Sequence, residues 1–61
     1  MYTKKEIEKH KGKSIQIGFE KEVIFGILKD ISDENIYMKT DKVDSAEIPI
    51  EDITSIVLHY V

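Results

Sequence analysis

Apolar and polar residues alternate in short runs along most of this chain, which is the period-two pattern of half-buried β-strands. The clearest run covers residues 14–19, where Ile15 and Ile17 alternate with small or polar residues. A single helical turn is predicted at residues 50–53. We expect one mainly β domain over residues 1–61, with short connections joining antiparallel strands. The pattern places its five strands at about residues 14–19, 22–31, 35–40, 45–50 and 54–60.

The second predicted strand, residues 22–31, is apolar on both faces and contains Gly26. A strand of this kind is expected to serve two parts of a folded sheet, and it must then bend sharply. Glycine marks such bends because it has no side chain to resist the coiling. The side chains expected to be buried come from the second, fourth and fifth strands: Phe25, Ile27, Leu28, Ile48, Ile56 and Leu58.

A short helix is predicted at about residues 3–11, ahead of the strands. Thr3 and Glu6 have the spacing of a capping box, in which the two side chains satisfy free backbone amides of the first turn. Gly12 can adopt the left-handed backbone conformation that commonly ends a helix. The helix has few apolar residues, so it cannot be stable alone, and we expect Tyr2 and Ile7 to cover an open end of the folded sheet.

The chain is small for an independently folded domain. A domain of about 60 residues buries only about 60% of the surface of its unfolded chain, which leaves a thin margin of stability. Cysteine is absent, so disulfides and thiolate metal sites are excluded and self-association remains as a supplement. No apolar run approaches the roughly 18 residues of a membrane span. We expect a cytoplasmic protein without a membrane partner.

Charge is distributed unevenly along the chain. Residues 1–13 hold five lysines and two glutamates, a charge of +3, whereas residues 14–61 hold four lysines and ten acidic residues, a charge of −6. Every basic residue is a lysine, so the chain lacks the guanidinium fork that binds guanine or phosphate with two hydrogen bonds. The acidic body should repel nucleic acid. The lysines of the first segment form either a solvated helix face or a site for an anionic partner: Lys4, Lys5, Lys9, Lys11 and Lys13.

Motifs for catalysis or metal binding are weak. His10 and His59 lie far apart in the sequence, and His10 is explained by its place near the end of the helix. The acidic turn at residues 30–34 offers oxygen ligands but lacks the glycine and the distal glutamate of a calcium loop. There is no nucleophile elbow and no phosphate-binding glycine loop. We therefore expect no enzyme activity, no cofactor and no bound metal.

One helix followed by five short strands resembles the small SH3-like barrels of the Sm and Sm-like family. The first Sm motif is matched in part by Gly26, Ile27 and Leu28, by Ile31, and by Asn35 after the turn. The resemblance implies a small five-stranded antiparallel SH3-like barrel with a short N-terminal α-helix. In that family, the turn after the second strand and the turn after the fourth strand hold an RNA base between them.

This chain departs from the family at the positions that bind RNA. Ser32 stands where the first motif has an aspartate. The second motif, which is basic in the family, is replaced by the acidic stretch Pro49-Ile50-Glu51-Asp52. Only Asn35 keeps its position, and we favour the simpler explanation that it is a turn residue bonding to its own backbone. An RNA-binding pocket is therefore not carried over from the resemblance.

Two functional hypotheses remain open. The first is a small non-enzymatic regulator that docks on another protein through strand edges or loops; its lysine-rich, arginine-free composition would suit a bacterial, plasmid or phage protein. The residues expected to contact the protein partner are Tyr37, Val57, His59 and Tyr60. The alternative is an Sm-like protein that binds RNA weakly through the five N-terminal lysines and Asn35. Salt dependence separates the two, because phosphate contacts weaken steeply with salt.

The expected assembly differs from that of the family. Sm-like proteins form rings in which the fifth strand of one subunit pairs with the fourth strand of the next. Here the fourth strand carries Pro49, which cannot donate to a ladder if its nitrogen faces the neighbour. The fifth strand is apolar on both faces at residues 56–58. We expect a monomer or a two-fold dimer built on the edge of the fifth strand, rather than a ring.

Overall fold

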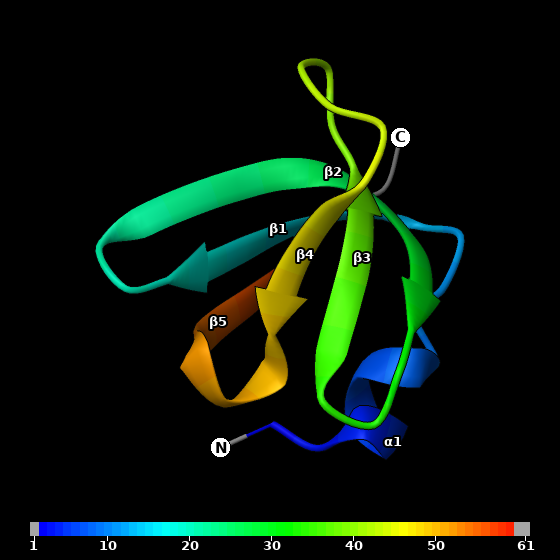
Figure 1. The fold of residues 1–61 in the computed structure, drawn as a ribbon, viewed down its shortest axis with the longest axis vertical. Helices are drawn as coiled ribbons and strands as arrows, with labels where there is room; N and C mark the ends of the chain where they lie inside the picture. Colours follow the sequence, from blue (N-terminus) through cyan, green and yellow to red (C-terminus); the bar gives the residue numbers. More distant parts are fainter. Residues whose placement is uncertain (1, 60–61) are drawn as a thin grey trace.

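The five predicted strands form a single antiparallel sheet in the computed structural model, which describes residues 2–59 (Figure 1). The mainly β class with a short N-terminal helix is thus confirmed. The elements are α1 (Lys4–Glu8), β1 (Ser14–Phe19), β2 (Glu22–Ile31), β3 (Asn35–Lys39), β4 (Ala46–Pro49) and β5 (Ile53–Leu58). The order across the sheet is β4-β3-β2-β1-β5, so β4 and β5 are its two edges. Within the described residues, no backbone ladder joins these edges, and the sheet is not closed.

The central strand β2 pairs with two neighbours. Its first part, residues 22–27, lies against β1, and its second part, residues 27–31, lies against β3. Figure 1 shows β2 running beside β1, curving, and continuing beside β3. A Cβ atom on Gly26 would collide with the backbone carbonyl oxygen of Lys39. Glycine is therefore required here because two backbones approach closely at the curve.

The core lies inside the curve of the sheet. Its members are all apolar and come from the helix, all five strands and the turn after β4: Ile7, Ile15, Ile17, Leu28, Ile36, Met38, Ile48, Ile50 and Ile53. No polar or charged side chain of the described residues is buried. Ile7 has no exposed surface, so the short helix is held to one end of the folded sheet by this side chain, as expected.

The prediction of burial was correct for some side chains of the core and wrong for others. Leu28 and Ile48 are buried, and Ile56 and Leu58 are half-buried against the core. Phe25 and Ile27, also expected in the core, are instead 54% and 39% exposed. Successive residues of a strand point to opposite faces, and β2 turns Gly26 and Leu28 inward. Phe25 and Ile27 must therefore face outward.

The helix is shorter than the predicted range of 3–11. The Thr3 hydroxyl accepts a 3.2 Å hydrogen bond from the backbone N–H of Glu6, which caps the first turn as expected. The Glu6 carboxylate meets the Thr3 hydroxyl at 3.1 Å, so the reciprocal half of the capping box is a contact between side chains. Beyond Glu8, the amides of His10, Lys11 and Lys13 each bond three residues back in tight turns. The N–H of Gly12, whose φ of 85° is left-handed, instead donates a 2.7 Å hydrogen bond to the carbonyl oxygen of Leu28.

The remaining boundaries differ from the predicted ones by one or two residues. β1 and β2 match their predicted ranges, β3 ends one residue early, and β4 is one residue shorter at each end. The predicted helical turn is present as the 3-10 turn η1 (Ile50–Asp52). β5 begins and ends earlier than the predicted 54–60, and Tyr60 lies outside the described residues. No helix within residues 2–59 is long and apolar enough to cross a membrane.

We predict that Leu28→Ala destabilises the protein far more than Phe25→Ala. Leu28 is fully buried, and such truncations cost about 2–5 kcal/mol because they leave a cavity. Phe25 is half exposed, so its truncation should cost about 1 kcal/mol. Urea denaturation of both variants measures the difference. If Phe25→Ala proved the more damaging change, the two faces of β2 would be interchanged.

Gly26→Ala should also destabilise the fold, by about 1–3 kcal/mol, because the added methyl group forces two backbones apart. The matched control is Gly18→Ala, whose added Cβ atom would meet the side-chain hydroxyl of Ser55 rather than a backbone atom. That hydroxyl can rotate, so the control should lose less stability. Thermal unfolding of the two variants tests this order, and equal losses would contradict the role given to the contact with Lys39.

Candidate interaction surface

The outward side of β5, β1 and β2 forms a three-stranded surface, bordered by a hollow of about 550 Å³ that Phe25 and Ile27 help to line. Gln16 on β1 lies opposite Phe25 on β2 and opposite Val57 on β5, so these three side chains form one row. The same pairing gives one further row on each side of the first. One contains Ile27, Ser14 and His59, and the other contains Val23, Gly18 and Ser55. We call this surface the outer face and define it by nine residues: Ser14, Gln16, Gly18, Val23, Phe25, Ile27, Ser55, Val57 and His59.

Four of the nine residues of the outer face have apolar side chains and none is a lysine, aspartate or glutamate, although 34% of the chain is charged. The nearest charged neighbour across the strands is Lys39 of β3, which pairs with Ile27 at the border of the face. Val23 and Phe25 are 63% and 54% exposed, and Ile27 and Val57 also face solvent. Contiguous exposed apolar groups on a small protein are typical of contact surfaces. This face can therefore bury apolar area against a partner without removing any charge from water.

A side-chain network orders the aromatic part of the outer face. The His59 ring meets the Phe25 ring edge to face, with centroids 4.8 Å apart and an interplanar angle of 76°. The Nε2 atom of His59 lies 3.1 Å from the Oε1 atom of Gln16. These contacts link all three strands of the face and hold Phe25 in place without burying it. An ordered exposed aromatic ring loses little conformational entropy when a partner covers it.

The structure brings together only part of the site predicted from the sequence. Val57 and His59 lie on the outer face. Tyr37 does not, because it is on β3, with β2 and β1 between it and β5, and its neighbours across the strands are Asp30 and Glu47. Tyr60 lies outside the described residues. Sequence reasoning missed Val23, Phe25 and Ile27 as surface residues because β2 is apolar on both faces.

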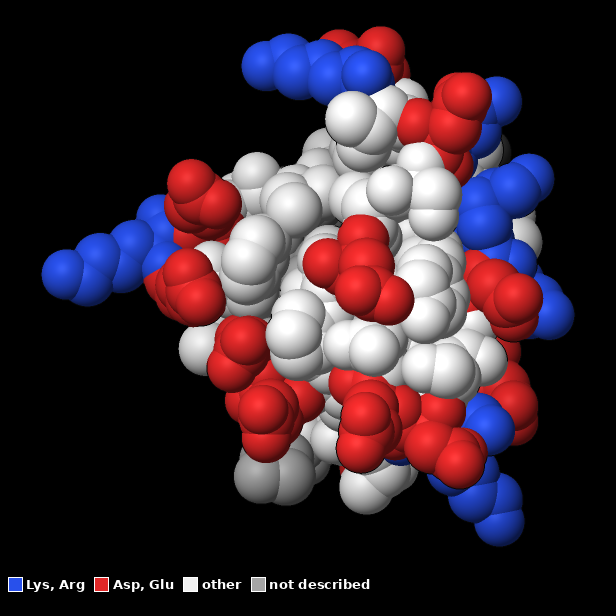
Figure 2. All heavy atoms as spheres, viewed as in Figure 1, with Lys and Arg blue, Asp and Glu red and all other residues white. Residues whose placement is uncertain are grey.

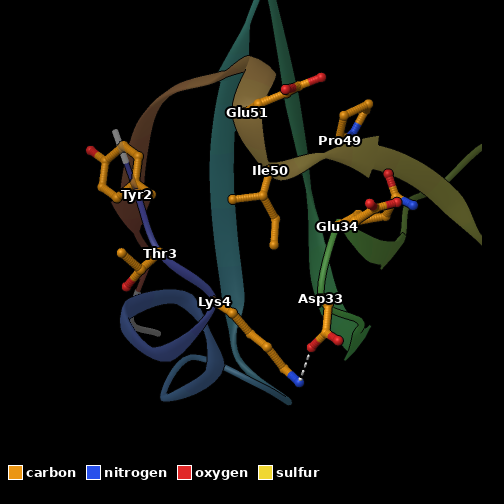
Figure 3. A pocket seen from close by; sticks show the side chains of 9 residues that line it. Tyr2, Thr3, Lys4, Asp33, Glu34, Pro49, Ile50 and Glu51 are labelled. Atoms are coloured by element: carbon orange, nitrogen blue, oxygen red, sulfur yellow. Dashed lines mark hydrogen bonds and ion pairs between the residues drawn. The ribbon is translucent and has the colours of Figure 1, made fainter.

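A second surface feature is a hollow of about 500 Å³ between the helix and the two turns that flank β3 and β4 (Figure 3). The turns are adjacent because Asn35 pairs with Pro49 and the backbone N–H of Ile50 donates a 2.9 Å hydrogen bond to the carbonyl oxygen of Glu34. The hollow is lined by Tyr2, Thr3, Lys4, Asp33, Glu34, Asn35, Pro49, Ile50 and Glu51. It thus contains Asn35, one of the residues considered for RNA.

The charge of this hollow is unfavourable for nucleic acid. Asp33, Glu34 and Glu51 supply carboxylates, whereas Lys4 is its one lining lysine. The Lys4 Nζ atom lies 3.0 Å from Asp33, and this hydrogen bond, together with the charge of Asp33, raises the pKa of Lys4. Figure 2 shows acidic side chains spread over this side of the molecule, with lysines mainly around its outline.

The N-terminal lysines do not form an unbroken free surface. Lys4 is paired with Asp33, and the Lys11 Nζ atom lies 3.5 Å from Asp30. The pKa of Asp30 is lowered, first by the hydrogen bond from the backbone N–H of Ile31 and then by the charge of Lys11. Lys5, Lys9 and Lys13 are exposed. The five lysines are therefore partly neutralised by acidic residues of the same chain.

Two hydrogen bonds between Ser32 and Asn35 close the turn before β3. The Ser32 hydroxyl accepts a 3.1 Å hydrogen bond from the Asn35 N–H, and the Ser32 N–H donates a 2.8 Å hydrogen bond to the Asn35 carbonyl oxygen. Ser32 thus closes the turn before β3. Within residues 2–59, no group of three or more histidine or acidic side chains is placed to hold a metal ion.

The outer face and the hollow are thus the two features that could support a function, one apolar and neutral, the other acidic. Their residues come from different strands and face different sides of the sheet. In comparisons with known proteins, the chain matches no protein-family model, and neither the curated proteins nor the solved structures include a significant match.

Proposed function

We propose that this chain is a small non-enzymatic interaction module, a regulator that docks on another protein through the outer face. The observation that supports this most directly is the row of Phe25, Gln16 and Val57, which exposes apolar groups on a surface without charge. A chain of 61 residues has little apolar material to spare from its core. Placing Val23, Phe25 and Ile27 outside is therefore best explained by a contact.

The chemistry of the outer face indicates the kind of contact. It is a sheet surface whose middle row ends on β2 in an ordered phenyl ring, Phe25, so a partner would cover that ring as the main anchor. A partner with an apolar surface fits, because an unpaired charge buried against this face would lose its hydration. Binding of this type depends little on salt.

We also propose that the fold is a divergent small barrel of the SH3-like, Sm-like type. Three features support this: five antiparallel strands in one sheet, a long curved second strand with a glycine at the curve, and a short helix ahead of the first strand. The interior of the curved sheet is filled by side chains, as in other small barrels.

RNA binding through the N-terminal lysines is the alternative function, and the contacts favour it less. Two of the five lysines are paired with Asp33 and Asp30, and the hollow beside the helix is lined with carboxylates. A single strand of RNA that followed the helix would approach these acidic groups.

We predict a dissociation constant for oligo-uridine and oligo-adenine weaker than about 10⁻⁶ M at about 0.15 M salt, which is the range of non-specific binding. The reason is the low density of free lysines and the acidic hollow. Fluorescence anisotropy with labelled oligonucleotides measures it. A tighter complex that weakens steeply with salt would contradict this prediction and favour the RNA-binding alternative.

Phe25→Lys should abolish capture of the protein partner or weaken it by about 30-fold, as expected for the loss of a main anchor worth about 2 kcal/mol. The matched control is Val43→Lys, because Val43 is 47% exposed in the loop before β4, away from the outer face. A pull-down from the native host with mass spectrometry identifies the partner, and titration of the purified partner gives the affinities.

Thermal unfolding is the control for both lysine variants. Each should remain folded, since neither substitution removes a buried side chain. The proposed function is contradicted if Phe25→Lys binds the purified partner as tightly as the unchanged chain. It is also contradicted if the Val43→Lys control loses the partner to the same extent.

A further inference from the structure

The two edge strands of the sheet differ in how well they are protected against pairing. β4 has four residues, among them Glu47 and Pro49. β5 has six residues, Ile-Thr-Ser-Ile-Val-Leu, with neither a charge nor a proline. Charged residues and proline are the usual means by which proteins block an exposed edge. The edge of β5 has neither.

Backbone orientation strengthens the contrast at β4. The N–H of Ile50 donates to the carbonyl oxygen of Glu34, the residue before β3, so it points toward β3. Backbone groups of successive residues in a strand point to opposite sides, and the nitrogen of Pro49 therefore faces the free edge. Proline has no N–H to donate there. Within β4, only Glu47 offers a donor on that side.

The free edge of β5 has a backbone N–H donor at each outward-facing position, whereas the free edge of β4 lacks one at Pro49. The N–H of His59 donates a 3.1 Å hydrogen bond to the carbonyl oxygen of Ser14, so it points toward β1. By the same alternation, Val57 also faces β1, whereas Ile56 and Leu58 direct their N–H and C=O groups to the free side. Two donors and two acceptors thus stand at the regular spacing of an antiparallel ladder.

We propose that the edge of β5 binds a second copy of this chain in an antiparallel, two-fold contact centred on Val57. In this register, Ile56 of one copy exchanges both backbone hydrogen bonds with Leu58 of the other, and the symmetry repeats the exchange. Val57 then lies on the axis, opposite Val57 of the second copy. The edge is its own complement, which is the requirement for a two-fold interface.

Charge supports a second copy as the occupant. The chain has a net charge of −3, so two copies repel each other on average. Pairing at β5 limits this repulsion, because no residue of β5 or of the outer face is a lysine, aspartate or glutamate. The charged residues that line a hollow with Ile56 and Leu58, Glu6 and Lys9, are of opposite sign. On the outer face, the row of Phe25, Gln16 and Val57 continues without interruption into the same row of the second copy.

The contact should be reversible. A standard stable interface covers about 800 Å² per partner, which is close to a fifth of the 4366 Å² surface of this chain. One strand edge covers less than this, so we expect a dimer that forms at high micromolar concentration. A head-to-tail ring would need the edge of β4, where Pro49 removes a donor. The dimer leaves Phe25 free, and it does not depend on the proposed function.

The first test is analytical ultracentrifugation from about 10 to about 500 µM. The mass should rise with concentration from 7.1 kDa toward twice that value. Val57→Lys should weaken the association at least tenfold, because two lysines would meet on the axis. Val43→Lys, at a position of matched exposure (47% against 46%), should leave it unchanged. Phe25→Lys should still dimerise, which separates this proposal from the proposed function.

The second test uses the absence of cysteine in the chain. Val57→Cys should form a disulfide dimer when oxidised glutathione accepts the two electrons and two protons of the thiol pair, because directly opposed side chains lie close in a non-hydrogen-bonded pair. Val43→Cys should react at least tenfold more slowly. A mass that stays at 7.1 kDa up to 500 µM, a mass six or seven times larger, or equal rates for both cysteines would overturn the proposal.

Discussion

The close approach of Gly26 on β2 to the backbone carbonyl oxygen of Lys39 is the contact on which the rest of this structure depends. β2 is the central strand, and the curve at this point lets it pair with β1 and then with β3. Because the sheet folds here, one side becomes the inside of a curve and can be filled by a core. The short helix then needs only Ile7 to cover one end.

The same curve separates two surfaces with opposite character. On the β5–β1–β2 side, apolar residues face water without any charge among them. On the side of the two turns, Asp33, Glu34 and Glu51 surround a hollow in which Lys4 is already paired. In the function that we propose, the first surface would favour apolar partners and the second would repel anionic ones.

Some of this arrangement could be predicted from residues alone. β1 and β2 have the predicted bounds because charged and turn-forming residues flank clear apolar runs. The 3-10 turn at Ile50–Asp52 and the cap at Thr3 were also predicted, since both depend on neighbours in sequence. The burial of Phe25 and Ile27 was predicted wrongly. When both faces of a strand are apolar, alternation gives the period but not which residues face inward.

The sequence by itself determined that this chain is a small, mainly β domain with a basic head and an acidic body, because composition and local periodicity carry that information. Only the tertiary structure decided which side of β2 meets the core, which strands are the edges, and which way the nitrogen of Pro49 points. Each of these depends on the neighbour that a strand pairs with. Those pairings join residues far apart in the chain, and no local pattern of side chains specifies them.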